Sequence, residues 1–177
     1  MQLARTVGRV TIGGLFVAHG TQKLFGWFGG PGLDGTEGMM TALGYHPPRQ
    51  QAMTAGVVEA GAGAMLALGL GTPLAAAGLT GVMASAVRDV HASKGLWNSD
   101  GGYEYNLVLV AALADLAENG PGTLSLDRAL GIERRGIRWG VGAVVLGVSA
   151  SFLNAALSRR LREREQAGRE LDDAATA

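Results

Sequence analysis

Four ionisable residues lie inside long apolar stretches of the chain: Arg9, His19, Lys23 and Glu59. At about 100° per helical residue, the first three fall within a sector of about 80° on one helix. Charge at membrane depth is costly unless it is paired or hydrated, so we expect this stripe to face a bundle interior or a water-filled cavity. Arg9 or Lys23 is the expected partner of Glu59. Such a pair beside His19 can relay protons, or it can simply hold two helices together.

A second set of polar and aromatic residues opens the fourth apolar segment. Glu104 and Tyr105 belong to the sequence GGYEY, and Tyr103 and Trp97 are close by in the chain. The aromatic side chains could form a lip over a pocket, or an interfacial belt that anchors helices at the membrane surface. The sequence shows no nucleotide-binding fingerprint, no nucleophile triad and no clustered ligands for a di-iron or haem site. We therefore expect no metal centre.

The composition limits the classes of function. The chain has 177 residues, of which 47% are hydrophobic and 17% are charged, and its formal net charge is zero. No overall electric field attracts nucleic acid, so we expect no nucleic-acid partner. The absence of cysteine excludes disulfides, thiolate metal sites and Cys-X-X-Cys chemistry. Any redox role must therefore use a bound cofactor or a partner protein.

Five apolar segments must position the candidate residues. About 20 apolar residues are needed to cross the bilayer core as a helix, and all five prolines fall at the ends of these segments or between them. The pattern predicts an all-α integral membrane protein with helices over residues 6–28, 51–70, 73–90, 103–118 and 137–157. The segment 103–118 is short, and a helix lying on the membrane surface is the alternative for it.

Polar and glycine-rich segments connect these helices. Residues 29–50 form an expected loop that is long enough to fold over one mouth of a bundle. Thr72 is the expected N-cap of the third helix, followed by Pro73 as its first residue. Residues 159–177 mix charges of both signs, which favours a frayed solvated helix or a disordered, flexible tail. Basic residues before and after the fifth segment would lie on opposite sides of the membrane, so the positive-inside rule gives no orientation.

Several motifs resemble those of the DoxX family. They are Arg9 with HGTQKLFG at 19–26, the run EAGAGAMLALG at 59–69, GGYEY at 101–105 and GPGTLSLD at 120–127. The resemblance covers roughly residues 5–130 and implies a four-helix membrane domain over 1–130 in the plasma membrane. Residues 131–158 would then be an additional transmembrane helix, and 159–177 a charged tail. Family members resemble small membrane subunits of a thiosulfate:quinone oxidoreductase, and one is linked to an oxidant-defence complex.

The resemblance implies a small membrane subunit associated with redox chemistry or oxidative stress. We expect such a subunit to bind a quinone between its first, second and fourth helices. Its electrons would come from a soluble redox partner protein, because the chain has no intrinsic cofactor site. The ligand-binding candidates are Arg9, His19, Lys23, Glu59, Glu104 and Tyr105. A non-catalytic scaffold and a small proton-coupled carrier built around Glu59 are the alternatives, and each is compatible with a homo-oligomer.

Overall fold

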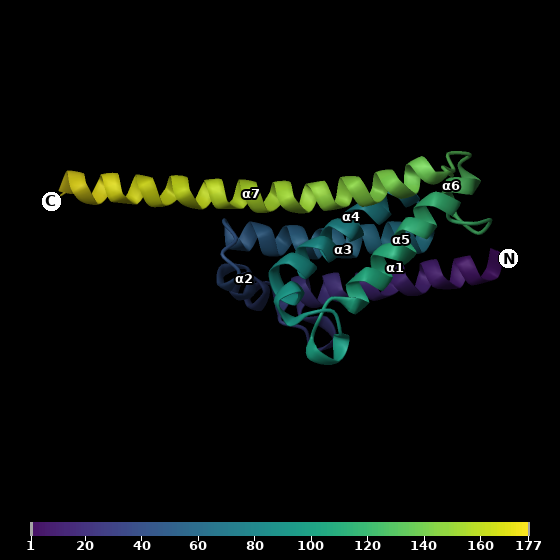
Figure 1. The fold of residues 1–177 in the computed structure, drawn as a ribbon, viewed down its shortest axis with the longest axis horizontal. Helices are drawn as coiled ribbons and strands as arrows, with labels where there is room; N and C mark the ends of the chain where they lie inside the picture. Colours follow the sequence, from purple (N-terminus) through teal and green to yellow (C-terminus); the bar gives the residue numbers. More distant parts are fainter. Residues whose placement is uncertain (1, 177) are drawn as a thin grey trace.

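The computed structural model describes the backbone of residues 2–176 and the side chains of residues 3–176. The described residues are all-α, with seven α-helices (Figure 1) and four short 3-10 or π-helical turns, which we label η. The bounds are α1 Gln2–Phe25, η1 Trp27–Gly29, α2 Gly32–Ala42, α3 Pro48–Leu68, α4 Thr72–Ala86, η2 Val87–His91, η3 Ala92–Lys94, η4 Asn98–Asp100, α5 Glu104–Asn119, α6 Leu126–Ala129 and α7 Ile137–Thr176.

The long helices α1, α3, α4, α5 and α7 form one bundle (Figure 1). α1 packs chiefly on α3, whereas α4 lies against α3, α5 and α7. The N-terminus and α6 lie at one end of the bundle. α2 lies at the other end, and α7 runs past the bundle there to the C-terminus. Every long helix therefore runs from one end of the bundle toward the other.

Glycines let α1 and α3 approach closely. A Cβ atom added to Gly13 would lie 2.6 Å from the backbone nitrogen of Ala67. One added to Gly63 would lie 2.8 Å from the carbonyl oxygen of Gly13. Neither position has room for a side chain unless a helix moves. Close backbone contact of this kind is typical of small residues at membrane-helix interfaces, and it holds the polar stripe of α1 against α3.

α1 ends three residues earlier than the sequence predicts. Gly26 adopts a left-handed conformation (φ 72°), and Phe28 in the following turn also has a positive φ of 54°. Phe25, Trp27 and Phe28 are exposed and contact one another, with ring centroids 5.4 Å and 6.5 Å apart. Exposed aromatic rings at the end of an apolar helix are typical of a membrane interface.

The predicted loop over residues 29–50 is wrong in part, because its middle forms α2. Asp34 lies in the first turn, where a carboxylate favours a helix N-terminus, and Thr36 donates a hydrogen bond to the carbonyl of Gly32 (2.7 Å). Thr36 and Met40 are buried and stand four residues apart, so they share one helix face. This face packs on α1 and α3. The sequence analysis did not predict this helix, because the glycines of the segment interrupt the helical repeat of apolar residues.

The third predicted helix divides into α4 and the π-helical turn η2. Thr72 is not its N-cap. Gly71 takes that position in a left-handed conformation (φ 55°), and the carboxylate of Asp127 accepts hydrogen bonds from the backbone nitrogens of Gly71 (2.7 Å) and Thr72 (3.0 Å). The cap at Thr72 was therefore a wrong prediction, because the capping group comes from a residue 55 positions along the chain.

The fourth and fifth predicted helices are present as α5 and α7. α5 packs on the bundle through one face, on which Leu109, Leu113 and Leu116 are buried, whereas Leu107 and Val108 on another face are exposed. α7 packs on α4 at Gly147, where an added Cβ atom would lie 2.8 Å from the Cβ atom of Thr80. α7 continues to Thr176, so the described part of the charged tail is helical and exposed.

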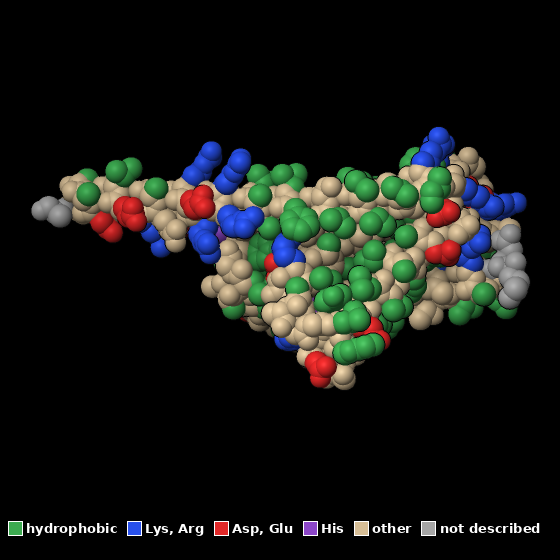
Figure 2. Space-filling view, viewed as in Figure 1, with side chains coloured by type: hydrophobic (Ala, Val, Ile, Leu, Met, Phe, Trp, Pro, Cys, Tyr) green, Lys and Arg blue, Asp and Glu red, His purple; other side chains and the backbone are tan. Residues whose placement is uncertain are grey.

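Two of the described helices, α3 and α7, are long and apolar enough to cross a membrane. Only 28% and 22% of the residues in their apolar windows are buried, and the other residues of these windows are at least partly exposed. Figure 2 shows hydrophobic side chains over the middle of the bundle, with many Lys and Arg side chains where α7 leaves it and at the opposite end. Exposed apolar residues of α7 include Val141, Val145, Leu146, Phe152 and Leu153. An apolar belt between charged ends is typical of a bundle surrounded by lipid.

Candidate functional site

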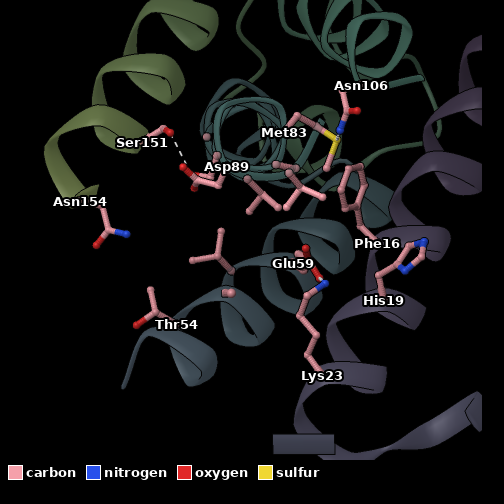
Figure 3. A pocket seen from close by; sticks show the side chains of 18 of the residues that line it. Phe16, His19, Lys23, Thr54, Glu59, Met83, Asp89, Asn106, Ser151 and Asn154 are labelled. Carbon is pink, nitrogen blue, oxygen red and sulfur yellow. Dashed lines mark hydrogen bonds and ion pairs between the residues drawn. The ribbon is translucent and has the colours of Figure 1, made fainter. Parts of the chain in front are cut away.

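A cavity of about 660 Å³ lies inside the bundle, between α1, α2, α3, α4, α5 and α7 (Figure 3). Most of its lining is apolar and includes Phe16, Val58 and Leu109. A cavity of this size with apolar walls and a few converging polar groups is typical of a small-molecule site. The polar groups form two clusters, one on α1 and α3 and the other around the π-helical turn after α4.

The first polar cluster consists of His19, Lys23 and Glu59. Lys23 Nζ lies 2.6 Å from Glu59 Oε2, and the side chains of these two residues are 22% and 5% exposed. The sequence predicted that Glu59 pairs with a cation of the first helix, and the structure identifies that cation as Lys23. His19 lies one helical turn before Lys23 and lines the cavity (Figure 3). Within the described part of the chain, no hydrogen bond engages its ring, so both ring nitrogens can meet a ligand.

Exposed lining residues on both helices, His19 among them, indicate a lateral opening of the cavity between α1 and α5. These two helices make few contacts with each other. Leu15 on α1 and Tyr105 on α5 both line the cavity, yet they are 47% and 50% exposed. The cavity is therefore accessible from the side of the bundle, where the surrounding surface is apolar.

The second polar cluster consists of Tyr45, Arg88, Asp89 and Ser151. The guanidinium of Arg88 donates to both carboxylate oxygens of Asp89 (2.7 and 2.8 Å) and to Ser151 Oγ (2.8 Å). The hydroxyl of Tyr45 donates to Asp89 Oδ2 (2.7 Å) and accepts from Arg88 Nη2 (2.5 Å). Burial raises the pKa of Tyr45, and the hydrogen bond to Asp89 raises it further, so the phenol keeps its proton at neutral pH. The cluster joins the segment before α3, the π-helical turn and α7.

Arg9, a predicted ligand-binding residue, lies outside the cavity. It is 2% exposed and donates three hydrogen bonds to backbone carbonyls: to Leu66 (3.0 Å), Ala67 (2.5 Å) and Leu124 (2.6 Å). The first two belong to the last turn of α3, whose carbonyls have no partner within the helix. Arg9 therefore completes the end of α3 and does not pair with Glu59.

Glu104 and Tyr105 are adjacent in the chain, but only Tyr105 lines the cavity. Glu104 accepts a hydrogen bond from the backbone nitrogen of Asn98 (3.0 Å) in an exposed loop, away from the cavity lining. Tyr105 lines the cavity at its lateral opening. Trp97 is 61% exposed and also lies outside the lining. Of the aromatic residues considered for a lip over the pocket, Tyr105 reaches the cavity.

The sequence analysis missed several residues of the cavity wall. Gln51 and Asn154 exchange two amide hydrogen bonds (3.3 and 3.0 Å) that bridge α3 and α7. Ser151 and Asn154 stand three residues apart and so share one face of an apolar helix, which was a usable signal for a polar contact. The adjacent Arg88 and Asp89 at the end of an apolar segment were a second signal. Tyr45 carries no such signal, because its partners are distant in the sequence.

The structure is a helix bundle with an internal cavity and an apolar outer belt, and the family comparison agrees with a membrane protein. A family model described as DoxX matches residues 4–92, which is half of the chain. The chain belongs to the DoxX family. This DoxX protein is accordingly a membrane protein. No curated protein and no solved structure matches it.

The matched range of this DoxX protein is shorter than the expected residues 5–130. It contains the first polar cluster and Asp89, but it ends before the GGYEY and GPGTLSLD motifs. α5 and α7 lie beyond it and supply Tyr105, Ser151 and Asn154 to the cavity. One wall of the cavity is therefore built by helices that the family match does not cover.

Proposed function

We propose that this DoxX protein is a multi-pass protein of the plasma membrane in which α1, α3, α4, α5 and α7 cross the bilayer. α3 and α7 are long and apolar enough to do so, and the other three helices lie alongside them (Figure 1). α4 and the π-helical turn together contain 15 and 5 residues, about 30 Å of helix, which is the thickness of the hydrocarbon core. In this arrangement, α7 is the additional helix beyond a four-helix bundle.

In this proposal the cavity binds a lipid-soluble carbonyl compound of the quinone class. The observation that carries it is the ion pair of Lys23 and Glu59, with His19 one turn away, in the wall of a largely apolar cavity. The N–H groups of Lys23 and His19 can donate to a carbonyl oxygen, and the carboxylate of Glu59 can accept from the hydroxyl of the reduced form. The lateral opening between α1 and α5 gives such a ligand a path from the bilayer.

The physiological role that fits such a site is that of a small membrane subunit in redox chemistry or oxidant defence. The chain has no cysteine, so we expect a soluble redox partner protein to deliver the electrons. The titratable side chains of the first polar cluster would then move protons between the quinone and the surface.

Quinone binding to the purified protein in lipid nanodiscs tests this proposal. We expect saturable binding by the wild type and a loss of affinity of about tenfold or more in Glu59→Gln and in Lys23→Gln, since each removes a charged group that faces the ligand. Glu104→Gln is the matched control, because it makes the same change at a carboxylate outside the cavity. Failure of the well-folded wild type to bind any quinone would exclude the proposal.

One observation favours a scaffold as the second candidate. α7 continues past the bundle as an exposed helix. Arg162 and Glu165 still contact Gly44 and His46, and the residues after them, 166–176, give a partner protein a charged surface. In a pure scaffold, the Lys23–Glu59 pair only fastens α1 to α3. Quinone binding that depends on Glu59 would argue against that role. Assembly of partner proteins that persists in a Glu59→Gln variant without quinone binding would support it.

A further inference from the structure

A second hollow lies between α1 and α5, next to the central cavity. It has a volume of about 340 Å³, and its lining includes Gly8 and Ile12 from α1 and Ala112 and Leu116 from α5. Ile12 lines both this hollow and the central cavity. The two hollows are therefore neighbours that share a wall, and together they follow one face of α1. We call this feature the α1–α5 seam.

Small residues keep the α1–α5 seam open. A Cβ atom added to Gly8 would meet no atom within 4 Å, and Ala112 faces the hollow from α5 with only a methyl group. α1 and α5 make few contacts with each other, and the second hollow lies between them at Gly8. The lining of the second hollow includes two charged side chains, those of Arg5 and Asp115. The part of the lining toward Ile12 is apolar.

We propose that the α1–α5 seam holds the apolar chain of the ligand whose polar head binds at the first polar cluster. This inference rests on the proposed function and adds that the ligand is a long-chain quinone. His19 and Gly8 are separated by 11 positions, about 16 Å along the helix, which leaves room for an extended alkyl or prenyl chain. Ile12 lines both hollows, so the central cavity and the second hollow meet at this side chain.

The position of the head supports this direction. Lys23 lies in the last turn of α1, close in the chain to the exposed aromatic residues Phe25 and Trp27, which are typical of a membrane interface. A chain running from there toward Gly8 follows the helix axis into the apolar part of the bundle. This is the orientation of an amphipathic molecule in a bilayer, with its head at the interface and its chain along the normal.

A chain-length comparison tests the inference with the full-length protein in nanodiscs. The probes are a benzoquinone that carries a decyl chain and the same benzoquinone with a methyl group in its place. Gly8→Leu fills the α1–α5 seam, and its control is Gly14→Leu, which places the same side chain at an exposed position of α1 with no atom within 4 Å. Each ligand is compared with itself across variants, so its partitioning into lipid cancels.

We expect Gly8→Leu to weaken binding of the decyl quinone about tenfold and to change binding of the methyl quinone by less than about twofold. Gly14→Leu should change neither. An equal effect of Gly8→Leu on both ligands, or no effect on either, would overturn the inference while the proposed function stands. If a membrane lipid fills the seam, the decyl chain adds nothing to binding by the wild type. Gly8→Leu would then not distinguish the two quinones, and this result too would overturn the inference while the proposed function stands. Failure of both quinones to bind the wild type would instead overturn the proposed function.

Photolabelling provides a second measurement that needs no variant. A decyl quinone with a diazirine at the end of its chain should label residues 4–12 and 112–116, as located by mass spectrometry. Labelling confined to the outward apolar residues of α7, such as Val145 and Leu153, would show that the chain lies in bulk lipid, and it would overturn the inference.

Discussion

Asp127 Oδ2 accepts two hydrogen bonds from Thr72, one from its backbone nitrogen (3.0 Å) and one from its hydroxyl (2.9 Å). Asp127 Oδ1 accepts a third from the backbone nitrogen of Gly71 (2.7 Å), and the residue is 2% exposed. The carboxylate thus satisfies N–H groups that have no partner within α4 and meets the positive end of the helix dipole. The motif GPGTLSLD ends in Asp127, so its last residue fastens the segment before α7 to the turn between α3 and α4.

We expect Asp127→Ala to lower the free energy of unfolding by about 3 kcal/mol, because it removes a charged cap and leaves buried N–H groups without partners. Chemical unfolding in detergent measures the change. Asp115→Ala is the control, since Asp115 is exposed and accepts its hydrogen bond from the neighbouring Asn119. Equal stability of the two variants would contradict the capping role.

Arg9→Gln should destabilise the protein without weakening ligand binding by the folded fraction. Arg9 is buried and donates to three carbonyls at the end of α3 and in the segment before α6, so we expect a loss of about 2–4 kcal/mol. The cavity is unchanged, because Arg9 does not line it. Unfolding and quinone titrations on the same sample check both statements, with the exposed Arg159→Gln as control. A stable Arg9→Gln protein that binds no quinone would restore Arg9 as a ligand-binding residue.

The raised pKa of Tyr45 predicts that the stability of the protein depends on pH in the alkaline range. Burial raises the pKa of Tyr45 in the folded state, so the folded protein holds this proton more tightly than the unfolded chain. The resulting stability is fully present below the unfolded pKa of about 10 and is lost as the pH rises from there through the folded pKa. We expect the free energy of unfolding of the wild type to fall more steeply above about pH 10 than that of Tyr45→Phe. Parallel curves for the two proteins would contradict this assignment.

The sequence predicted those features that depend on local pattern. Long apolar runs gave the helices around α1, α3, α5 and α7, and the three-residue stripe on α1 predicted a polar wall that contains Lys23 and His19. The sequence did not predict α2, because its glycines interrupt the apolar repeat, although Thr36 and Met40 are buried on one face of the helix.

The features that the sequence could not give depend on distant partners. Whether Arg9 or Lys23 would pair with Glu59 is decided by depth in the bundle, since both lie on the same side of α1. Arg9 donates hydrogen bonds to carbonyls at the end of α3, and Lys23 pairs with Glu59 in the cavity wall. The cap at Asp127 and the contact of Tyr45 with Asp89 join positions 55 and 44 apart, which no helical period encodes.

Gly147 should tolerate no large side chain, because α7 packs there against the backbone of α4. A Cβ atom at Gly147 would lie 2.8 Å from the Cβ atom of Thr80 and 2.9 Å from the backbone nitrogen of Gly81. We expect Gly147→Leu to destabilise the protein by about 2 kcal/mol or more and to raise the protease sensitivity of the connection before α7. Gly142→Leu is the matched control, since a Cβ atom there meets nothing within 4 Å. Similar behaviour of the two variants would show that α7 does not pack closely on α4.

A double-mutant cycle on Lys23 and Glu59 separates their structural role from ligand binding. Lys23→Met alone leaves the carboxylate of Glu59, whose side chain is 5% exposed, without its cation, so we expect a loss of about 3–5 kcal/mol. The double variant Lys23→Met with Glu59→Met leaves no buried charge and should be more stable than the Lys23→Met variant. Unfolding in detergent measures the stabilities.

The same double variant decides between a binding site and a scaffold. Because it keeps apolar volume while it removes both charged groups, we expect it to fold, to keep the cavity and to lose quinone affinity by more than about tenfold. A folded double variant that binds quinone as the wild type does would show that the pair only joins α1 to α3. In that case the ligand would have to be recognised by the second polar cluster, where Tyr45 and Asp89 line the cavity, and Tyr45→Phe would become the variant that weakens binding.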